Sequence, residues 1–460
     1  MSTECSDGQL ELHGLGRREV VARFDAAPIT SDGGGVLLRE VDLRVNALGR
    51  LAACFVDHRN PELIQHSVAE LVSQRVLGLA LGYEDLNDHD RLRQDRWLGV
   101  LVGREDPERA LAGKSTLNRL ELTPWNADAS ARYKKVVARP GAMDSLLVDL
   151  FLESHAEPPR RIWLDLDATD DPLHGAQEGR FFHGYYGHYC YLPLYIFAGE
   201  HLLCARLRES NLDAAAGAVE ELERIVGRIR QAWPEVEVVI RADSGFCREE
   251  IMAWCEANRV DYVLGLAKNT RLQRAMGAAL ARSAARHRES GEAAREYVEL
   301  RYQTKKSWSR VRRVIGKAEH LDKGANPRFV VTSLSLEEVD AQTLYEELYC
   351  ARGDMENRIK EQQLMLFADR TSTATLRANQ LRLYFSSFAY VLLAALRRLG
   401  LAGTELARAQ CDTIRLKLLK VGAQLKITVR RIRLSLSASY PHQALFTRVC
   451  ANLQAFPLRC

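Results

Sequence analysis

The chain has 460 residues, of which 47% are hydrophobic and 27% are charged, and its net charge is +4. This length predicts two to four domains with ample chain for a large core. No apolar run reaches ~18 residues, and residues 1–8 lack the basic and apolar regions of a signal peptide. We therefore expect a cytoplasmic protein with no membrane partner. The ten cysteines form no C-x-x-C pair, which argues against zinc and against a disulfide framework.

The first third of the chain is predicted to be helical. Residues 1–30 are loosely patterned and are interpreted as an N-terminal tail. Residues 31–155 carry helical apolar patterns separated by turns, and Glu157-Pro158-Pro159 closes the segment. Because apolar residues recur there at the spacing of one helix face, we expect an all-helical domain over residues 31–155.

From Arg160 onward the pattern changes to that of a mixed α/β unit. Apolar runs bounded by turn residues predict strands and helices in a fixed order. The expected elements are strands over 161–167, 189–197 and 201–207, a helix over 213–231, a strand over 235–242, a helix over 248–258 and a strand over 261–266. Three strands, a helix, a strand, a helix and a strand is the order of a ribonuclease H-like core, as in retroviral integrases. We assign this domain to residues 156–402.

Two strongly basic regions interrupt and follow this unit. Residues 268–317 contain fourteen Lys or Arg against four acidic residues, a net charge of +10. Residues 371–460 contain fourteen against two, a net charge of +12. We interpret residues 268–340 as a basic, β-rich insertion and residues 403–460 as a basic C-terminal region. Such asymmetry favours a polyanionic partner, although charge runs are often only solvated faces.

Three acidic residues stand out against this background. Asp167 and Asp243 each end an apolar strand pattern, and Glu356 follows Gly353, which we expect to break the chain before a new helix. On that helix Tyr349, Arg352, Glu356 and Lys360 recur at three or four residues and share one face. Two strand-end aspartates and a helical glutamate are suited to divalent cations that assist phosphoryl transfer.

These blocks resemble the signature of DDE transposases of bacterial insertion sequences. The three sequence motifs are Asp167-Ala-Thr169, Arg241-Ala-Asp243-Ser-Gly-Phe246 and Tyr349-x-x-Arg352-x-x-x-Glu356. They belong to the large group that includes the insertion-sequence-four class. His174-Gly-Ala-Gln-Glu-Gly, His183-Gly-Tyr-Tyr and Tyr191-Leu-Pro-Leu look most like the insertion-sequence-1380 family. One position departs from the group's pattern, because Gln363 stands where a lysine follows the glutamate by seven residues.

The resemblance implies a cut-and-paste transposase. Asp167, Asp243 and Glu356 would hold two Mg²⁺ ions, for which Mn²⁺ could substitute, and would catalyse DNA cleavage and strand transfer. Double-stranded DNA would be the partner, both as terminal inverted repeats and as target, and the DNA complex would be a homodimer. The ends of the element would bind in residues 31–155.

The resemblance also implies six DNA-binding residues, in two groups. Tyr349, Arg352 and Lys360 would contact phosphates near the cut, and Lys360 would take over the role of the missing lysine. Trp308 would stack on an extruded base between Lys306 and Arg310. A tryptophan of the insertion core is an equal alternative for Trp308.

Some alternatives stay open. Asp165 lies on the same strand face as Asp167 and competes with it as the first carboxylate. The chain could also be a metal-dependent nuclease without strand transfer, or a silent DNA-binding descendant of a transposase. A glycosidase with paired carboxylates is a more distant rival, which the basic regions disfavour.

Overall fold

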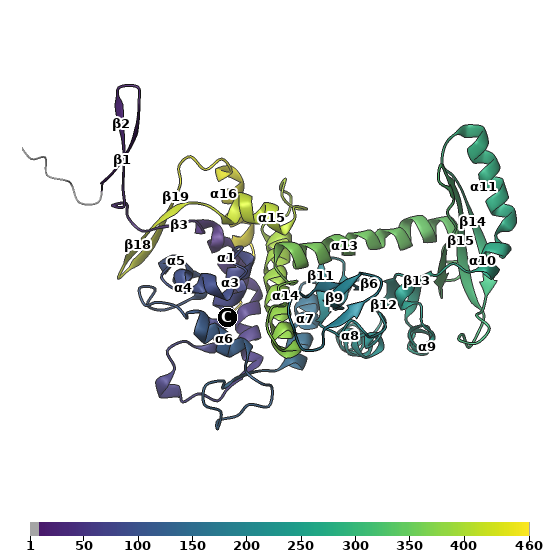
Figure 1. The fold of residues 1–460 in the computed structure, drawn as a ribbon, viewed down its shortest axis with the longest axis horizontal. Coiled ribbons are helices and arrows are strands. Elements are labelled where there is room, and N and C mark those ends of the chain that lie inside the picture. Colours follow the sequence, from purple (N-terminus) through teal and green to yellow (C-terminus); the bar gives the residue numbers. More distant parts are fainter. Residues whose placement is uncertain (1–8, 460) are drawn as a thin grey trace, which may run out of the picture.

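The computed structural model describes residues 9–459, and its centre is a mixed sheet of nine strands (Figure 1). The strands lie in the order β11-β10-β6-β12-β13-β17-β15-β14, and β16 pairs with β15. Their bounds are β6 (Arg161–Ala168), β10 (Leu194–Ala198), β11 (His201–Arg206), β12 (Glu237–Ala242), β13 (Asp261–Leu266), β14 (Ala294–Tyr302), β15 (Arg312–Leu321), β16 (Gly324–Ala325) and β17 (Arg328–Thr332).

Strand β6 divides its side chains between two environments. Ile162, Leu164 and Leu166 are buried in one hydrophobic cluster with residues of helices α8 (Ala218–Ala232) and α9 (Glu249–Ala257). Because side chains alternate along a strand, Asp165 and Asp167 point to the opposite face. β6 pairs antiparallel with β10 and parallel with β12. The polar face of β6 therefore lies away from α8 and α9.

The predicted order of strands and helices from 161 to 266 is confirmed, with one correction. The expected strand over 189–197 is two strands, β9 (His188–Tyr191) and β10, separated by Leu192 and Pro193. Proline has no N–H to donate to a sheet, so the chain leaves the ladder there. β9 instead joins a three-stranded sheet with β7 (Asp171–Pro172) and β8 (Phe181–His183).

The segment 268–340 contains the four strands β14 to β17, and it also contains two helices that the sequence analysis did not predict. Helices α10 (Thr270–Ala275) and α11 (Gly277–Ser290) precede β14. The alanines and arginines of α11 are good helix formers, whereas the strand-like pieces that follow them form β14 and β17. The strands of this segment also extend the main sheet, because β17 pairs antiparallel with β13. Figure 1 shows this part of the sheet, with α11 beside it, at one end of the molecule.

Residues 9–153 contain seven α-helices and five short strands. The helices are α1 (Val36–Val45), α2 (Ala47–Ala53), α3 (Val68–Ala80), α4 (His89–Leu92), α5 (Arg96–Val102), α6 (Lys114–Glu121) and α7 (Pro140–Glu153). Two corrections follow. β4 (Phe55–Asp57) and β5 (Val136–Ala138) pair with each other, so the segment 31–155 is not all-helical. Within the predicted tail, β1 (Gln9–Leu15) and β2 (Arg18–Arg23) form a hairpin that projects from the body (Figure 1). Residues 1–8 of that tail lie outside the described part of the chain.

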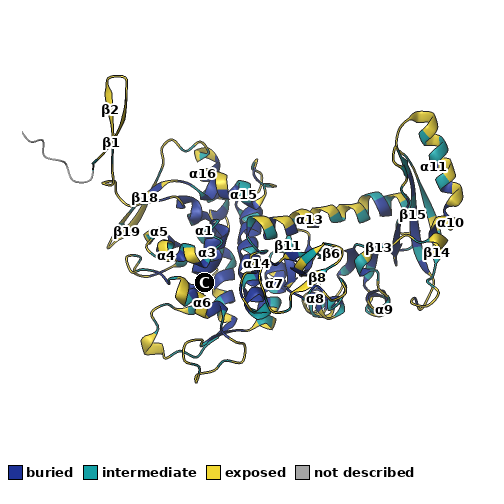
Figure 2. Ribbon diagram, viewed as in Figure 1, coloured by how far each residue is buried: buried dark blue, intermediate teal, exposed yellow. Residues whose placement is uncertain are grey.

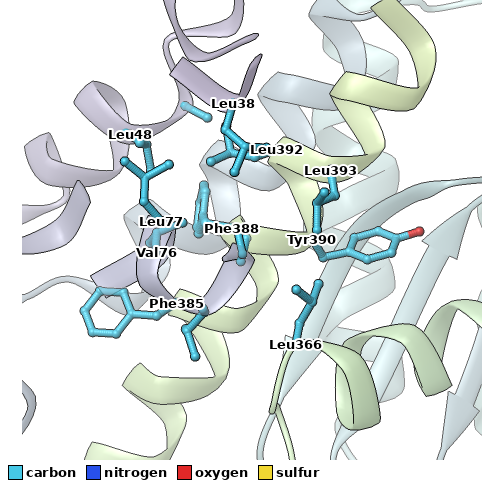
Figure 3. Packing of buried hydrophobic residues seen from close by; sticks show 14 of the residues in the cluster. Leu38, Leu48, Val76, Leu77, Leu366, Phe385, Phe388, Tyr390, Leu392 and Leu393 are labelled. Atoms are coloured by element: carbon cyan, nitrogen blue, oxygen red, sulfur yellow. The ribbon is translucent and has the colours of Figure 1, made fainter. Parts of the chain in front are cut away.

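Helix α14 (Leu376–Leu399) joins the N-terminal helices to the rest of the molecule. Its Phe385, Phe388 and Leu392 pack with Leu38 of α1 and Leu77 of α3 (Figure 3). All of these side chains are almost fully buried, and Figure 2 shows dark blue, buried stretches along α14 and the neighbouring helices. Large apolar burial of this kind is the main stabilising contribution to a fold. The segments 31–155 and 376–399 therefore share one core.

The basic C-terminal region contains both helix and strand. Its elements are α15 (Cys411–Ile414), β18 (Ala423–Thr428), β19 (Arg431–Leu436) and α16 (Gln443–Gln454). β18 pairs with β19 and with β3 (Ile29–Thr30) near the other end of the chain. In the described residues 9–459, the helices are all too short or too polar to cross a membrane.

Candidate active site

The parallel pairing of β6 and β12 brings two aspartates to one edge of the sheet. Asp167 is the second-last residue of β6, and Asp243 directly follows β12. Parallel neighbours end at the same edge, so both carboxylates emerge there. Asp243 is half-buried and caps the short 3₁₀ turn Ser244–Phe246, because its Oδ1 accepts a hydrogen bond from the Gly245 N–H at 2.8 Å. That bond fixes the direction of the Asp243 side chain.

One long, irregular helix lies against this edge. It consists of α12 (Ala341–Thr343), a π-helical turn (Leu344–Tyr349), a 3₁₀ turn (Cys350–Arg352), α13 (Gly353–Lys360) and a second π-helical turn (Glu361–Met365). Gly353 has helical angles, φ −56° and ψ −24°, so the expectation that it breaks the chain is wrong. π-helical turns inside helices are frequent at functional sites. Figure 1 shows the helix running from α14 toward β14 and β15.

Arg352 links the helix to the sheet edge. Its Nη1 lies 3.5 Å from Asp167 Oδ2, and its Nη2 donates to Glu356 Oε1 at 3.2 Å. The Arg352 side chain is 16% exposed, whereas that of Glu356 is 48% exposed. A single guanidinium therefore stands between carboxylates from the sheet and from the helix.

The charges of the three carboxylates interact. The pKa of Asp167 is raised to about 6, mainly by burial and also by the carboxylates of Asp243 and Glu356, against the opposing effect of Arg352. The charges of Asp243 and Glu356 thus both act on Asp167. Like charges held together in this way favour a bound cation.

Asp165, the competing candidate, is fully occupied by a different arginine. Arg241 Nε and Nη2 donate to its two oxygens at 2.6 and 2.8 Å. The Arg241 guanidinium also lies 4.9 Å from the centroid of the Trp163 ring, and its Nη1 donates to the Leu348 carbonyl at 2.7 Å. A bidentate pair of this kind uses the whole carboxylate. Asp165 therefore ties β6, β12 and the long helix together.

Tyr349 lies over a strand glycine. A Cβ atom at Gly265 of β13 would be 2.6 Å from the Tyr349 hydroxyl and 2.9 Å from the Ser244 nitrogen. Only glycine leaves room for this approach. The Asp243 charge and burial both act on the Tyr349 hydroxyl, burial being the stronger effect, and they raise its pKa. The Tyr349 hydroxyl and the backbone at Ser244 thus both lie close to Gly265.

Lys360 and Gln363 occupy different environments on the same helix. Lys360 is exposed. Gln363, which stands in place of the expected lysine, donates from Nε2 to the Asp170 carbonyl at 3.0 Å. This bond anchors the helix to the chain that follows β6. The glutamine therefore has a structural contact, and Lys360 is a cation that points to solvent.

The three expected DNA-binding residues of the insertion lie apart from this group. Their loop joins β14 to β15, and β15 is the fourth strand from β6, about 19 Å away at ~4.8 Å per strand. Trp308 is only 7% exposed, packs edge-on against Tyr302, and has Arg312 5.4 Å from its ring centroid. Its ring is therefore part of the insertion core and is not open to a base. Lys306 and Arg310 are exposed, and Arg310 pairs with Glu256.

Sequence reasoning missed the roles of Arg241 and Gly265. Arg241 is part of a quoted motif, but its charge alone does not show that it pairs with Asp165. Gly265 gives a weak signal, because a glycine inside a strand pattern often marks a close backbone approach. Both roles depend on contacts across strands.

The donor chemistry of the site fits a hard divalent cation. Carboxylate oxygens are the ligands that Mg²⁺ and Mn²⁺ prefer. Within residues 9–459, however, no group of three or more His, Cys, Asp or Glu side chains is gathered closely enough to hold a metal ion. The carboxylates thus provide suitable donor atoms, but the three side chains do not meet at one point.

The fold and the site together define a mixed α/β protein with an acidic group where two parallel strands meet a long helix. The chain belongs to the family described as "Transposase DDE domain group 1", whose model matches residues 12–458. The match covers nearly the whole chain and supports a transposase function. A search of curated proteins found no match.

Proposed function

We propose that the protein binds the terminal inverted repeats of an insertion sequence and catalyses metal-dependent DNA cleavage and strand transfer. One observation carries this proposal. Asp167 and Asp243 lie at the ends of two paired parallel strands, and Arg352 links Asp167 to Glu356 of the long helix. The site lies in a chain of the DDE transposase family. The resemblance to the insertion-sequence-1380 family remains a prediction within that family.

The proposed site would hold two Mg²⁺ ions, or Mn²⁺ in their place. Asp167, Asp243 and Glu356 would hold these ions. Bound in this way, divalent cations stabilise the attacking and leaving oxygens of a phosphodiester during in-line displacement. Asp165 is the weaker candidate, because both of its oxygens already accept hydrogen bonds from Arg241.

We also propose that five strands form a ribonuclease H-like core. The strands β11, β10, β6, β12 and β13 lie side by side in this order, with β6 antiparallel to β10 and parallel to β12. In chain order this is the arrangement 3-2-1-4-5. β17, β15 and β14 then extend the same sheet beyond β13.

Exposed cations on both sides of the site support DNA as the partner. The hairpin β18–β19 exposes Lys426, Arg430, Arg431 and Arg433. The insertion exposes Lys305, Lys306 and Arg310. Figure 1 shows these two parts at opposite ends of the molecule, with the long helix between them. Duplex DNA could contact both parts only along an extended surface, and Tyr349, Arg352 and Lys360 would contact phosphate near the site. We propose that residues 31–155 recognise the DNA ends and that the DNA complex is a homodimer.

The test is cleavage and joining of a labelled duplex that carries the DNA end flanking this gene, in Mg²⁺. We expect the wild type to give joined products, and Asp243→Asn to give none, because it loses a carboxylate charge at nearly constant size. Asp322→Asn, an exposed change on the β15–β16 turn, should behave like the wild type. Cleavage without joining would indicate a nuclease. Binding without cleavage, in several metals, would indicate a silent descendant and contradict the proposal.

A further inference from the structure

Two aspartates of β6 pair with arginines from other elements, and the two pairs differ sharply in their geometry. Arg241 holds Asp165 with two hydrogen bonds of 2.6 and 2.8 Å. Arg352 approaches Asp167 only to 3.5 Å. Within the described residues its Nη1, which makes this approach, is buried and finds no hydrogen-bond partner. A buried N–H without a partner is unfavourable. Arg241 and Asp165 therefore form a bidentate ion pair, whereas Arg352 and Asp167 form a longer ion pair without a hydrogen bond.

Arg352 occupies the space between two of the three carboxylates. Its guanidinium lies between Asp167 Oδ2 and Glu356 Oε1, within 3.5 and 3.2 Å. A cation that bridged these two oxygens would need the same space. The side chains of Glu356 and Arg352 have room to rearrange. Glu356 is half exposed, and Arg352 ends a 3₁₀ turn that follows a π-helical turn. Such irregular turns often mark hinges in a helix.

We infer that Arg352 is an internal counter-ion of Asp167 and Glu356 in the metal-free protein, and that a divalent cation must displace its guanidinium to bind them. This inference rests on the metal-dependent function proposed above. Metal and guanidinium compete for one place. The displaced guanidinium keeps its charge and its planar donors, which match a phosphate group. Metal entry would thus release Arg352 toward the DNA.

Removal of Arg352 should therefore strengthen metal binding in the absence of DNA, whereas loss of a simple phosphate contact would leave it unchanged. The test is titration of Mn²⁺ without DNA, with free Mn²⁺ measured by electron paramagnetic resonance. We expect Arg352→Gln to lower the Kd by about tenfold, because a close like charge is removed and the space is vacated. Arg352→Lys should fall in between, since a point charge cannot bridge both oxygens. The lysine variant also covers the case in which the glutamine variant does not fold.

Two controls make the result specific. Lys360→Gln removes the same charge from the same helix, one turn beyond Glu356, and should change the Kd by less than about twofold, because exposed charges are well screened. The double variant Asp167→Asn with Arg352→Gln should not show the lower Kd for Mn²⁺. An unchanged or higher Kd in Arg352→Gln would overturn the inference, as would an equal gain in Lys360→Gln. Because no DNA is present, failure of strand joining would contradict the proposed function and leave this inference intact.

Discussion

Arg241 shows how a single residue can support an active site without belonging to it. Its guanidinium joins Asp165 of β6 to the Leu348 carbonyl of the long helix. Asp165 is only 4% exposed. Arg241→Met would leave that carboxylate buried and unpaired, and we expect a loss of about 3–5 kcal/mol in the free energy of unfolding. Urea denaturation measures it. The double variant Arg241→Met with Asp165→Leu should recover most of the loss, and failure to recover would show that the pair does not act as a unit.

A buried histidine should make the fold sensitive to acid. His89 is fully buried, with Nδ1 3.1 Å from Gln74 Nε2, and burial lowers its pKa from 6.5 to about 3. The unfolded chain therefore binds a proton below pH 6.5 that the folded chain binds only near pH 3. Stability is then lost as pH falls through this window, by about 2 kcal/mol between pH 6.5 and 5. Denaturation at several pH values should show a smaller slope for His89→Phe. An equal slope would contradict this assignment.

At the scale of elements, the contact between β13 and the long helix depends on Gly265. A Cβ there would clash with the Tyr349 hydroxyl and with the backbone at Ser244. We expect Gly265→Ala to destabilise the fold by about 1–3 kcal/mol, as overpacking typically does. Adding Tyr349→Phe removes one of the two clashes, so thermal unfolding should show partial recovery. Full recovery would mean that the backbone at Ser244 moves freely, and no recovery would mean that the hydroxyl is unimportant.

The elements also show what the sequence could predict. The strand bounds around Asp167 and Asp243 follow from local apolar runs, and the predicted strand over 261–266 matches β13 in both bounds. The motifs also predict a grouping of Asp167, Asp243 and Glu356, which stays a prediction. Contacts between distant segments could not be predicted from the sequence. The burial of Trp308 under Arg312 and the bridging position of Arg352 depend on how strands and helix pack, and local patterns do not carry that information.

At the scale of the whole molecule, the basic excess of residues 371–460 serves two purposes. Some of its arginines hold the interior together. Arg382 pairs with the buried Glu121 at 2.7 Å, and Arg397 pairs with the buried Glu361 at 2.8 Å. Lys426 on β18 and Arg431 and Arg433 on β19 are exposed instead. A net charge counted along the sequence does not separate these two uses, so only the exposed cations support a polyanion-binding surface.

The exposed cations near β19 should set the salt dependence of DNA binding. Each cation that neutralises a phosphate contributes about 0.9 to the slope of log affinity against log salt. Changing Arg430, Arg431 and Arg433 to Gln should therefore reduce the slope by about 2–3, as measured by fluorescence anisotropy with a labelled duplex. The matched control changes the exposed Arg160, Arg228 and Arg259 to Gln; Arg228 lies on α8, which packs on the sheet face opposite to Asp167. Equal slopes in both triple variants would mean that DNA binding follows net charge alone, and would remove the β18–β19 hairpin from the proposed DNA surface.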